Sequence, residues 1–268
     1  RARIMQAMNE HAKPCGWTLV SLRPQGQHAP LRAAAHAAGA AGTVALSPWR
    51  LQRLHGADRR AQLEAALRAD HTLFTSPAAV VAAADLLAGF SAHDTAHWLA
   101  VGEGTLRALQ HAGVQGAHAP VRMDSEGLLA LPQLQQLHGA EVGLVTAPGG
   151  RGLIAPTLQQ RGARLLRADV YQRVPLPLPA RALARLSHAP QPWILALSSG
   201  EALQLAWQQL SPAWRQRWQQ QLAVVAASER LQEQALALGL RAVRQAEGPR
   251  PHQLVAAAAR LAADCRAA

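Results

Sequence analysis

The sequence of 268 residues predicts an α/β fold with two similar domains, each built on a mostly parallel sheet. Three observations support this prediction. Short apolar runs alternate with amphipathic runs along the chain, the alternation repeats after about 124 residues, and two proline-containing segments interrupt it. Apolar residues make up 49% of the chain, which is enough for a hydrophobic core and excludes a disordered protein.

Six strand-like runs each lead into a helix-like run, the pattern of successive βα units. The strand-like runs are WTLVSL (17–22), HTLFTS (71–76), HWLAVG (97–102), EVGLVTA (141–147), PWILALSS (192–199) and QLAVVAAS (221–228). The helix-like runs are APLRAAAHAAG (29–39), PAAVVAAADLLAGF (77–90), EGTLRALQHAG (103–113), GGRGLIAPTLQQRG (149–162), GEALQLAWQQL (200–210) and ERLQEQALALG (229–239).

The turns between these runs also repeat. The turn PQG at 24–26 matches PGG at 148–150, and Thr75 with Ser76 matches Ser198 with Ser199. Further along, Glu103 and Gly113 match Glu229 and Gly239. The three matches follow in the same order at nearly the same separation. They indicate two similar halves rather than chance likeness between alanine-rich helices.

Two segments break the alternation and predict the joints between the domains. These are LSPWRL (46–51) and VYQRVPLPLP (170–179). Proline fixes its own φ and pushes the preceding residue towards an extended conformation, so both segments are expected to be strand-like connectors. Two connectors allow two arrangements: successive domains, or one domain inserted into the other.

The charge of the chain narrows the class of ligand. The chain has 27 Lys and Arg residues against 16 Asp and Glu, a net charge of +11, and Lys13 is its only lysine. A cleft in a basic protein favours a polyanion, either nucleic acid or a small molecule with several carboxylates. The sequence lacks lysine clusters and a basic segment interleaved with aromatic residues, which argues against nucleic acid.

Cysteine usage and apolar patterning predict a cytoplasmic protein that does not enter a membrane. Cys15 and Cys265 are the only cysteines, and we expect unpaired thiols in a reducing cytosol. Apolar runs stay well short of the roughly 20 residues that span a bilayer, and the first residues lack the apolar core of a signal peptide. Residues 1–15 are expected to be an N-terminal extension, with Met8 as a natural start.

Every strand-like run ends in a polar or glycine-rich turn. In an open parallel sheet these turns gather at the carboxyl edge, where helix N-termini offer free N–H groups to carboxylates or phosphates. Ordinary N-capping by Ser and Thr is the alternative for any single turn. Six such turns on two domains favour an anion-binding cleft. They are RPQG (23–26), TS (75–76), GEGT (102–105), PGGR (148–151), SSG (198–200) and SER (228–230).

Several sharper motifs are absent from the sequence. It has no GxxxxGK[ST] nucleotide loop and no GxSxG nucleophile elbow. His93 and His97 have the i, i+4 spacing of a metal-binding helix, but Asp94 stands where a zinc protease carries Glu and no third ligand is nearby. We therefore do not predict a metal site.

Six segments, taken together, resemble the uroporphyrinogen-III synthase family. They are TSPAAV (75–80), AVGEGT (100–105), SEGLLAL (125–131), GGRGL (149–153), VYQRVP (170–175) and VVAASERL (224–231). Their order and spacing are more specific than any one of them, and the likeness runs from Trp17 to about Leu261. It implies two α/β domains joined by a two-stranded connector, with the active-site cleft between them. Residues 16–47 and 176–268 would form the first domain, and residues 48–175 the inserted second domain with the connectors.

The resemblance also implies a reaction and its partners. The substrate would be hydroxymethylbilane, an open tetrapyrrole with eight carboxylates. The family removes water, inverts ring D through a spiro intermediate and closes the ring as uroporphyrinogen III, without cofactor or metal. A transient contact with the preceding enzyme of the pathway is a further expectation. The alternative is a non-catalytic binding protein whose two lobes close on an acidic small ligand.

The family's site residues carry over to particular positions of this chain. Tyr171, the only tyrosine, would donate a proton to the leaving hydroxyl or position ring D, although a purely structural role beside the connector stays open. Three departures from the family pattern bear on single contacts: Ala78, Pro148 after Ala147, and the first serine of Ser198-Ser199. Carboxylates would be bound by Arg23, Thr75, Ser76, Gly102, Thr105, Gly150, Arg151, Ser198, Ser199 and Ser228.

Overall fold

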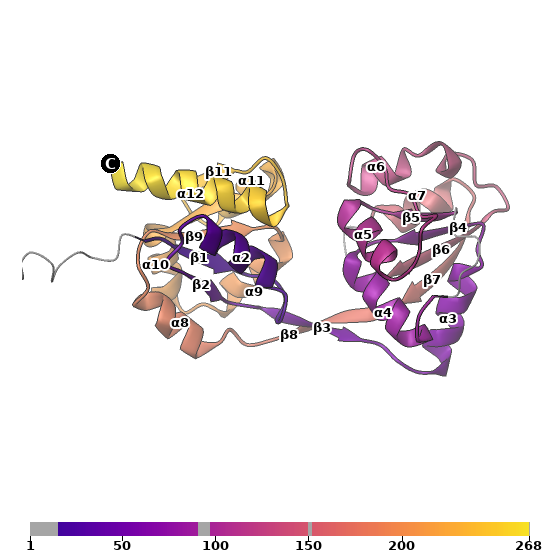
Figure 1. Cartoon of the computed structure of the whole chain (residues 1–268), viewed down its shortest axis with the longest axis horizontal. Coiled ribbons are helices and arrows are strands. Elements are labelled where there is room, and N and C mark those ends of the chain that lie inside the picture. Colours follow the sequence, from indigo (N-terminus) through magenta and orange to yellow (C-terminus); the bar gives the residue numbers. More distant parts are fainter. Residues whose placement is uncertain (1–15, 91–96, 150–151, 268) are drawn as a thin grey trace, which may run out of the picture. The chain divides into compact units, whose positions relative to one another are not determined.

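The computed structural model describes residues 16–90, 97–149 and 152–267, and the predicted α/β class is confirmed (Figure 1). The chain divides into two compact units. The first unit contains the described residues up to Arg50 and those from Pro175 onwards, and the second unit is Leu51–Val174. The predictions made for residues 1–15 and for His93 lie outside the described residues.

The first unit is built on a five-stranded sheet in the order β11-β10-β9-β1-β2, and every adjacent pair in it is parallel. Its three central strands are buried along their whole length, and β9 and β10 are entirely apolar, as expected where helices cover both faces of a parallel sheet. The strands are β1 (Thr18–Ser21), β2 (Gly42–Ala45), β9 (Trp193–Leu197), β10 (Leu222–Ala226) and β11 (Val243–Gln245).

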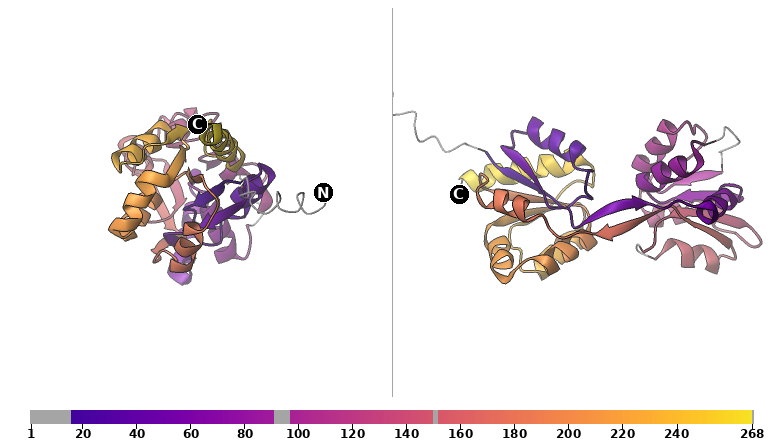
Figure 2. Two further views of the ribbon diagram at one scale, coloured as in Figure 1. Left: turned by 90° about the vertical axis from the view of Figure 1, so that its left-hand side faces the viewer. Right: turned by 90° about the horizontal axis from the view of Figure 1, so that it is seen from below.

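Helices cover both faces of this sheet. Helices α2 (Ala29–Ala37) and α12 (Pro251–Ala267) pack against a buried cluster that includes Leu19 and Ile194. In the right-hand view of Figure 2 these two helices lie on one side of the sheet and the orange helices on the other. The orange helices are α8 (Ala180–Ser187), α9 (Gly200–Gln209), α10 (Pro212–Gln221) and α11 (Glu229–Ala237).

The second unit has a parallel four-stranded sheet in the order β5-β4-β6-β7. Residues on one face, such as Phe74 and Val145, pack with α3, α4 and α5, whereas Leu73 and Leu144 pack with α6, η1 and α7 on the other. The strands are β4 (His71–Phe74), β5 (Trp98–Ala100), β6 (Glu141–Thr146) and β7 (Arg164–Asp169). The helices are α3 (Ala57–Leu67), α4 (Pro77–Leu87), α5 (Glu103–His111), α6 (Ser125–Leu129), η1 (Pro132–Leu134) and α7 (Ile154–Gln160).

The repeat found in the sequence is also a repeat of topology. The matched turns make β4 equivalent to β9, β5 equivalent to β10, and β6 equivalent to β1. Under this equivalence the order β10-β9-β1-β2 in the first sheet corresponds to β5-β4-β6-β7 in the second, and β11 is an addition. The two units are therefore copies of one arrangement whose strands occur in a different order along the chain.

The two proline-containing segments form the predicted two-stranded connector. Strands β3 (Trp49–Arg53) and β8 (Tyr171–Pro175) pair with each other and with no strand of either larger sheet. They run in opposite directions, because Leu54 N–H donates to the Val170 carbonyl while Leu176 N–H donates to the Pro48 carbonyl. The chain thus leaves and re-enters the first unit through one ribbon, which brings Tyr171 to the start of the return strand.

Among the described residues, no helix is long and apolar enough to cross a membrane. The same part of the chain contains no group of three or more His, Cys, Asp or Glu side chains that could hold a metal ion. Cys265 is an exposed free thiol, and Cys15 lies outside the described residues.

Candidate active site

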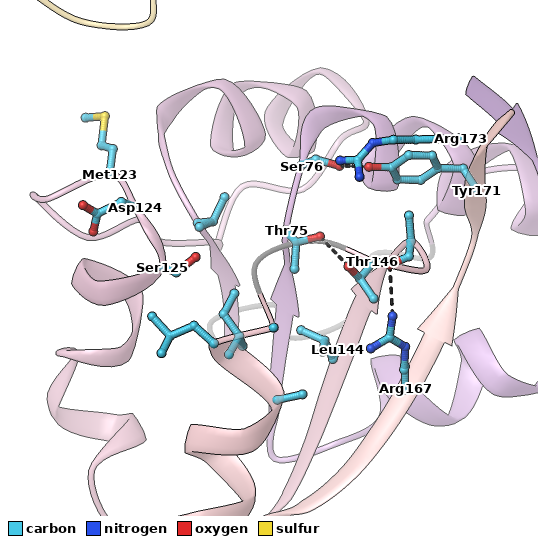
Figure 3. A pocket seen from close by; sticks show the side chains of 17 residues that line it. Thr75, Ser76, Met123, Asp124, Ser125, Leu144, Thr146, Arg167, Tyr171 and Arg173 are labelled. Atoms are coloured by element: carbon cyan, nitrogen blue, oxygen red, sulfur yellow. Dashed lines mark hydrogen bonds between the residues drawn. The ribbon is translucent and has the colours of Figure 1, made fainter. Parts of the chain in front are cut away.

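A cavity of about 370 Å³ opens at the carboxyl edge of the sheet in the second unit (Figure 3). Strand β4 ends at Phe74 and β6 ends at Thr146, and because the two strands are parallel their ends meet at one edge. Thr75, Ser76 and Thr146 line the cavity from these ends. Tyr171 and Arg173 line it from β8.

Ser76 and Tyr171 form the hydrogen-bonded pair of this cavity. Ser76 is the N-cap of α4: its Oγ accepts the N–H of Ala79 at 3.1 Å, and Pro77 occupies the first helical position. The hydroxyl of Tyr171 lies 3.1 Å from the same Oγ. The ring of Tyr171 is 5% exposed, so the phenol is held by core packing with its oxygen at the first turn of a helix.

A second pair of hydroxyl groups joins the ends of neighbouring strands. Thr75 Oγ1 donates to Thr146 Oγ1 at 2.9 Å, and the backbone N–H of Thr75 donates to the Val145 carbonyl at 3.2 Å. Thr75 Oγ1 also lies 3.4 Å from the Val145 carbonyl, and each hydroxyl has one proton and two acceptor positions. The three hydroxyl groups of Thr75, Ser76 and Thr146 thus face the cavity on adjacent strand ends.

Three charged side chains line the cavity within the described part of the chain. Arg167 on β7 pairs with Asp169 at 2.9 Å and donates to the Ala147 carbonyl at 3.0 Å. Asp124 pairs with Arg122 and caps α6 by accepting the N–H of Gly127 at 2.7 Å. Arg173 extends from β8 beside Tyr171 and Ser76 (Figure 3).

Apart from Ser125, the remaining side chains of the walls are apolar. Met123 and Leu153 line the cavity and are 50% and 37% exposed, respectively. Val101, Leu144 and Ile154 line it as well. A cavity with hydroxyl and guanidinium donors on one side and aliphatic carbon on the other suits a ligand with an apolar body and acidic arms.

Two further residues predicted to bind substrate in this unit do not line the cavity. Gly102 precedes α5 and is packed closely, because a Cβ there would lie 3.1 Å from the Cβ of Met123. Thr105 is only 2% exposed, within the first turn of α5. Gly150 and Arg151 lie outside the described residues. The substrate-binding roles of these four residues stay predictions.

In the first unit, the predicted residues also follow the carboxyl ends of strands. Arg23 follows β1, and its Nε is buried with no hydrogen-bond partner among the described residues; burial lowers the pKa of this guanidinium. Ser198 is exposed after β9, while Ser199 caps α9 by accepting the N–H of Ala202 at 3.2 Å. Ser228 is the N-cap residue of α11 and makes no side-chain capping bond.

Five positions after Arg23 the chain carries a buried histidine, His28, which the sequence patterns did not indicate. Nδ1 of His28 lies 2.9 Å from Ser21 Oγ, and its Nε2 lies 2.7 Å from Ser47 Oγ. The network joins the turn after β1 to the segment that leads into β3. Burial, followed by the charges of Arg32 and Arg23, lowers the pKa of His28, so the imidazole is held neutral.

Most lining residues of the cavity were not predicted from the sequence, and Thr146, Arg167 and Arg173 are among them. Thr146 ends a strand-like run, so the rule that ligands bind at carboxyl edges could have found it. Arg173 stands two residues after Tyr171 in a predicted strand, which places both side chains on one face. Arg167 had no such signal, because β7 lacks a regular apolar alternation.

The fold and the cavity define a class of protein: an α/β protein of two equivalent parallel-sheet units, one of which holds a hydroxyl- and arginine-lined pocket at its strand ends. A family model described as uroporphyrinogen-III synthase HemD matches residues 31–256. The chain belongs to the uroporphyrinogen-III synthase family.

Curated relatives agree with this assignment. The chain is 32% identical over 151 residues to uroporphyrinogen-III synthase of Escherichia coli (strain K12) and 33% identical over 152 residues to that of Salmonella typhimurium. Each match covers 56% of this chain and 61% of the relative, less than two thirds of its length.

Two crystal structures share the fold. A mutant uroporphyrinogen III synthase from the extremely thermophilic bacterium Thermus thermophilus is similar with a TM-score of 0.61 at 19% identity, covering 93% of this chain and 100% of that one. The uroporphyrinogen-III synthetase from Helicobacter pylori 26695 has a TM-score of 0.62 at 14% identity, covering 91% and 99%. At these identities the likeness is one of fold.

Proposed function

We propose that this chain is a uroporphyrinogen-III synthase, which converts hydroxymethylbilane into uroporphyrinogen III and water. Family membership supports the proposal, and the curated relatives carry this name. The observation that carries it is the Ser76–Tyr171 pair, a phenol fixed at a helix N-terminus in a pocket with acid-binding donors.

The first step is loss of the hydroxyl group of the bilane. Electron density from the neighbouring pyrrole nitrogen expels the hydroxyl, and Tyr171 donates a proton to it so that water leaves. In this proposal Ser76 is the donor of the 3.1 Å hydrogen bond to the phenol oxygen, while the N–H of Ala79 donates to Ser76. This chain of donors turns the phenol proton towards the pocket and stabilises the charge that develops on the phenol oxygen.

The second step forms the inverted ring. The electrophilic carbon left by the hydroxyl is attacked by the substituted carbon of ring D, which gives a spiro intermediate. One carbon–carbon bond of the spiro centre then breaks and a new one forms, and loss of a ring proton restores the pyrrole and completes the macrocycle. That proton can return to the phenol oxygen, so Tyr171 ends the cycle as it began. The protein's main task in this step is to hold the folded geometry.

Other parts of the proposal concern binding and location. Thr75 and Thr146 would hold carboxylate arms in the second unit, and Arg23, Ser198, Ser199 and Ser228 would do so at the strand ends of the first unit. We further propose that the protein acts in the cytoplasm and contacts the preceding enzyme of the pathway transiently.

The test is the isomer of the product. Purified protein receives freshly made hydroxymethylbilane, the products are oxidised, and type I and type III uroporphyrin are separated. The proposal predicts type III as the main product, because closure without the enzyme gives the uninverted type I isomer. Type I alone at every protein concentration would contradict it and would favour a non-catalytic protein that binds an acidic ligand.

A further inference from the structure

We propose that Arg173 binds the carboxylate arm next to the hydroxymethyl group of the substrate and thereby places the leaving hydroxyl at Tyr171. The inference rests on the proposed function, because it assigns one substrate carboxylate to one side chain of the same pocket. It makes Arg173 a substrate-binding residue that fixes the position of the reacting ring relative to Tyr171.

The first support is the alternation of side chains on β8. Tyr171 and Arg173 line the pocket, whereas the amide of Gln172 points to β3 and lies 3.3 Å from the amide oxygen of Gln52. Residues two apart on a strand share a face and are about 7 Å apart. Figure 3 shows the phenol and the guanidinium extending side by side from β8 towards Ser76.

The second support is the place of each charged residue of the pocket in the fold. Arg167 is tied to Asp169 and to the Ala147 carbonyl, which secures the turn after β6. Asp124 starts α6 by capping it. Arg173 is the charged pocket residue on the strand that also carries the phenol.

The third support is the chemistry of the ligand. Each pyrrole ring of the bilane carries two carboxylate arms, and on the ring that loses its hydroxyl one arm stands on the carbon next to the hydroxymethyl group. The two groups therefore point to the same side of the ring, as the phenol and the guanidinium do on β8. A guanidinium binds a carboxylate through two parallel hydrogen bonds, which fixes direction as well as distance.

Arg173→Gln tests the assignment against a matched arginine. Arg164→Gln is the control, because Arg164 is a 73% exposed residue at the start of β7 that pairs with Glu141 and does not line the pocket. Arg173→Gln should lower kcat/KM for type III formation by about ten- to a hundredfold, mainly through KM, as expected for the loss of one charge-assisted contact. Arg164→Gln should leave kcat/KM unchanged. Arg173→Lys should have an intermediate kcat/KM, because lysine keeps the positive charge but lacks the two parallel N–H donors of a guanidinium.

A modified substrate separates a direct contact from a structural effect. In this bilane the arm next to the hydroxymethyl group is replaced by a methyl group. For the wild-type protein, kcat/KM on this substrate should fall by about the same factor as kcat/KM of Arg173→Gln falls on the natural substrate. The wild type and Arg173→Gln should then have equal kcat/KM on the modified substrate. If Arg173→Gln remains tenfold or more worse than wild type on the modified substrate, the assignment is overturned.

A binding measurement tests the inference independently of the proposed function. The probe is a monopyrrole with one acetate and one propionate arm, titrated into each protein by NMR. Weaker binding of the probe to Arg173→Gln than to Arg164→Gln supports the carboxylate contact, even if the wild-type protein forms no type III product. A lack of type III product would contradict only the proposed function. Affinity that does not depend on Arg173 overturns the inference even if type III forms.

Discussion

The hydroxyl group of Tyr171 lies 3.1 Å from Ser76 Oγ, and the same serine accepts the N–H of Ala79 at 3.1 Å. One serine thus joins the first turn of α4 to the only tyrosine of the chain. Ser199 caps α9 of the first unit in the same way, 3.2 Å from the N–H of Ala202. The two equivalent units share the capping geometry, and the second unit adds a phenol to it.

Removal of the Ser76 hydroxyl group should change the environment of the Tyr171 phenol. With tyrosine labelled at 13Cζ, the protein gives a single signal, and Ser76→Ala should shift it and lower type III formation by about tenfold, because the phenol loses a neutral hydrogen bond. Ser211→Ala is the control: Ser211 caps α10, 3.3 Å from the N–H of Trp214, and does not line the pocket. Both variants should lose about 1 kcal/mol of stability. An unmoved signal in Ser76→Ala would contradict the pairing.

Gly143 should be essential to the packing of the second unit. A Cβ at this position of β6 would collide with the carbonyl oxygen of Ala66 at the end of α3, whereas a Cβ at Gly42 of β2 would meet nothing within 4 Å. Gly143→Ala should therefore lower the free energy of unfolding by about 3 kcal/mol, and Gly42→Ala should change it by less than about 0.5 kcal/mol. Urea unfolding of both variants provides the comparison. Equal stability of the two would refute the close packing of β6 on α3.

Acid should destabilise the first unit through His28. Its pKa in the folded state is lowered by burial and by Arg32 and Arg23, from a reference of 6.5. Between the lowered folded value and 6.5 the unfolded chain binds the extra proton, so stability falls as the pH drops below about 6.5. Burial also lowers the pKa of His71 in the second unit, which adds a loss of the same sign there.

The contribution of His28 is isolated by comparing His28→Gln with the wild type. At pH 7.5 the variant should be less stable than the wild type. Between pH 7 and pH 5 its stability should fall less than that of the wild type, and the difference is the contribution of His28. Thermal unfolding across this range measures it. Parallel pH curves for the two proteins would show that His28 does not titrate with folding.

Most of the architecture could be predicted because it depends on local patterns. Six apolar strands, the helices that follow them and the two connectors were indicated by the sequence, and the repeat predicted the equivalence of β9 and β4. The strands β2, β7 and β11 were not indicated. Each of them is short or only partly buried and lies at an edge of its sheet, where alternation is weak.

The site was predicted less completely because it depends on contacts between distant segments. The turn holding Ser76 was indicated by its capping pattern, but its pairing with Tyr171 joins residues that are 95 positions apart. Thr105 was selected as a turn hydroxyl, and the structure buries it in the first turn of α5, so its substrate-binding role stays a prediction. The Ser21–His28–Ser47 network depends on how the end of β1, the start of α2 and the segment before β3 meet, which no local pattern records.

The most direct test of the account is the rate of type III formation by Tyr171→Phe in a single turnover, with protein in excess over hydroxymethylbilane. The ring of Tyr171 supplies the packing, so the variant should fold as the wild type does. We predict a rate at least about a hundredfold lower, since a positioned proton donor is lost, with the substrate closing to type I instead. An unchanged rate of type III formation would contradict the role of the phenol.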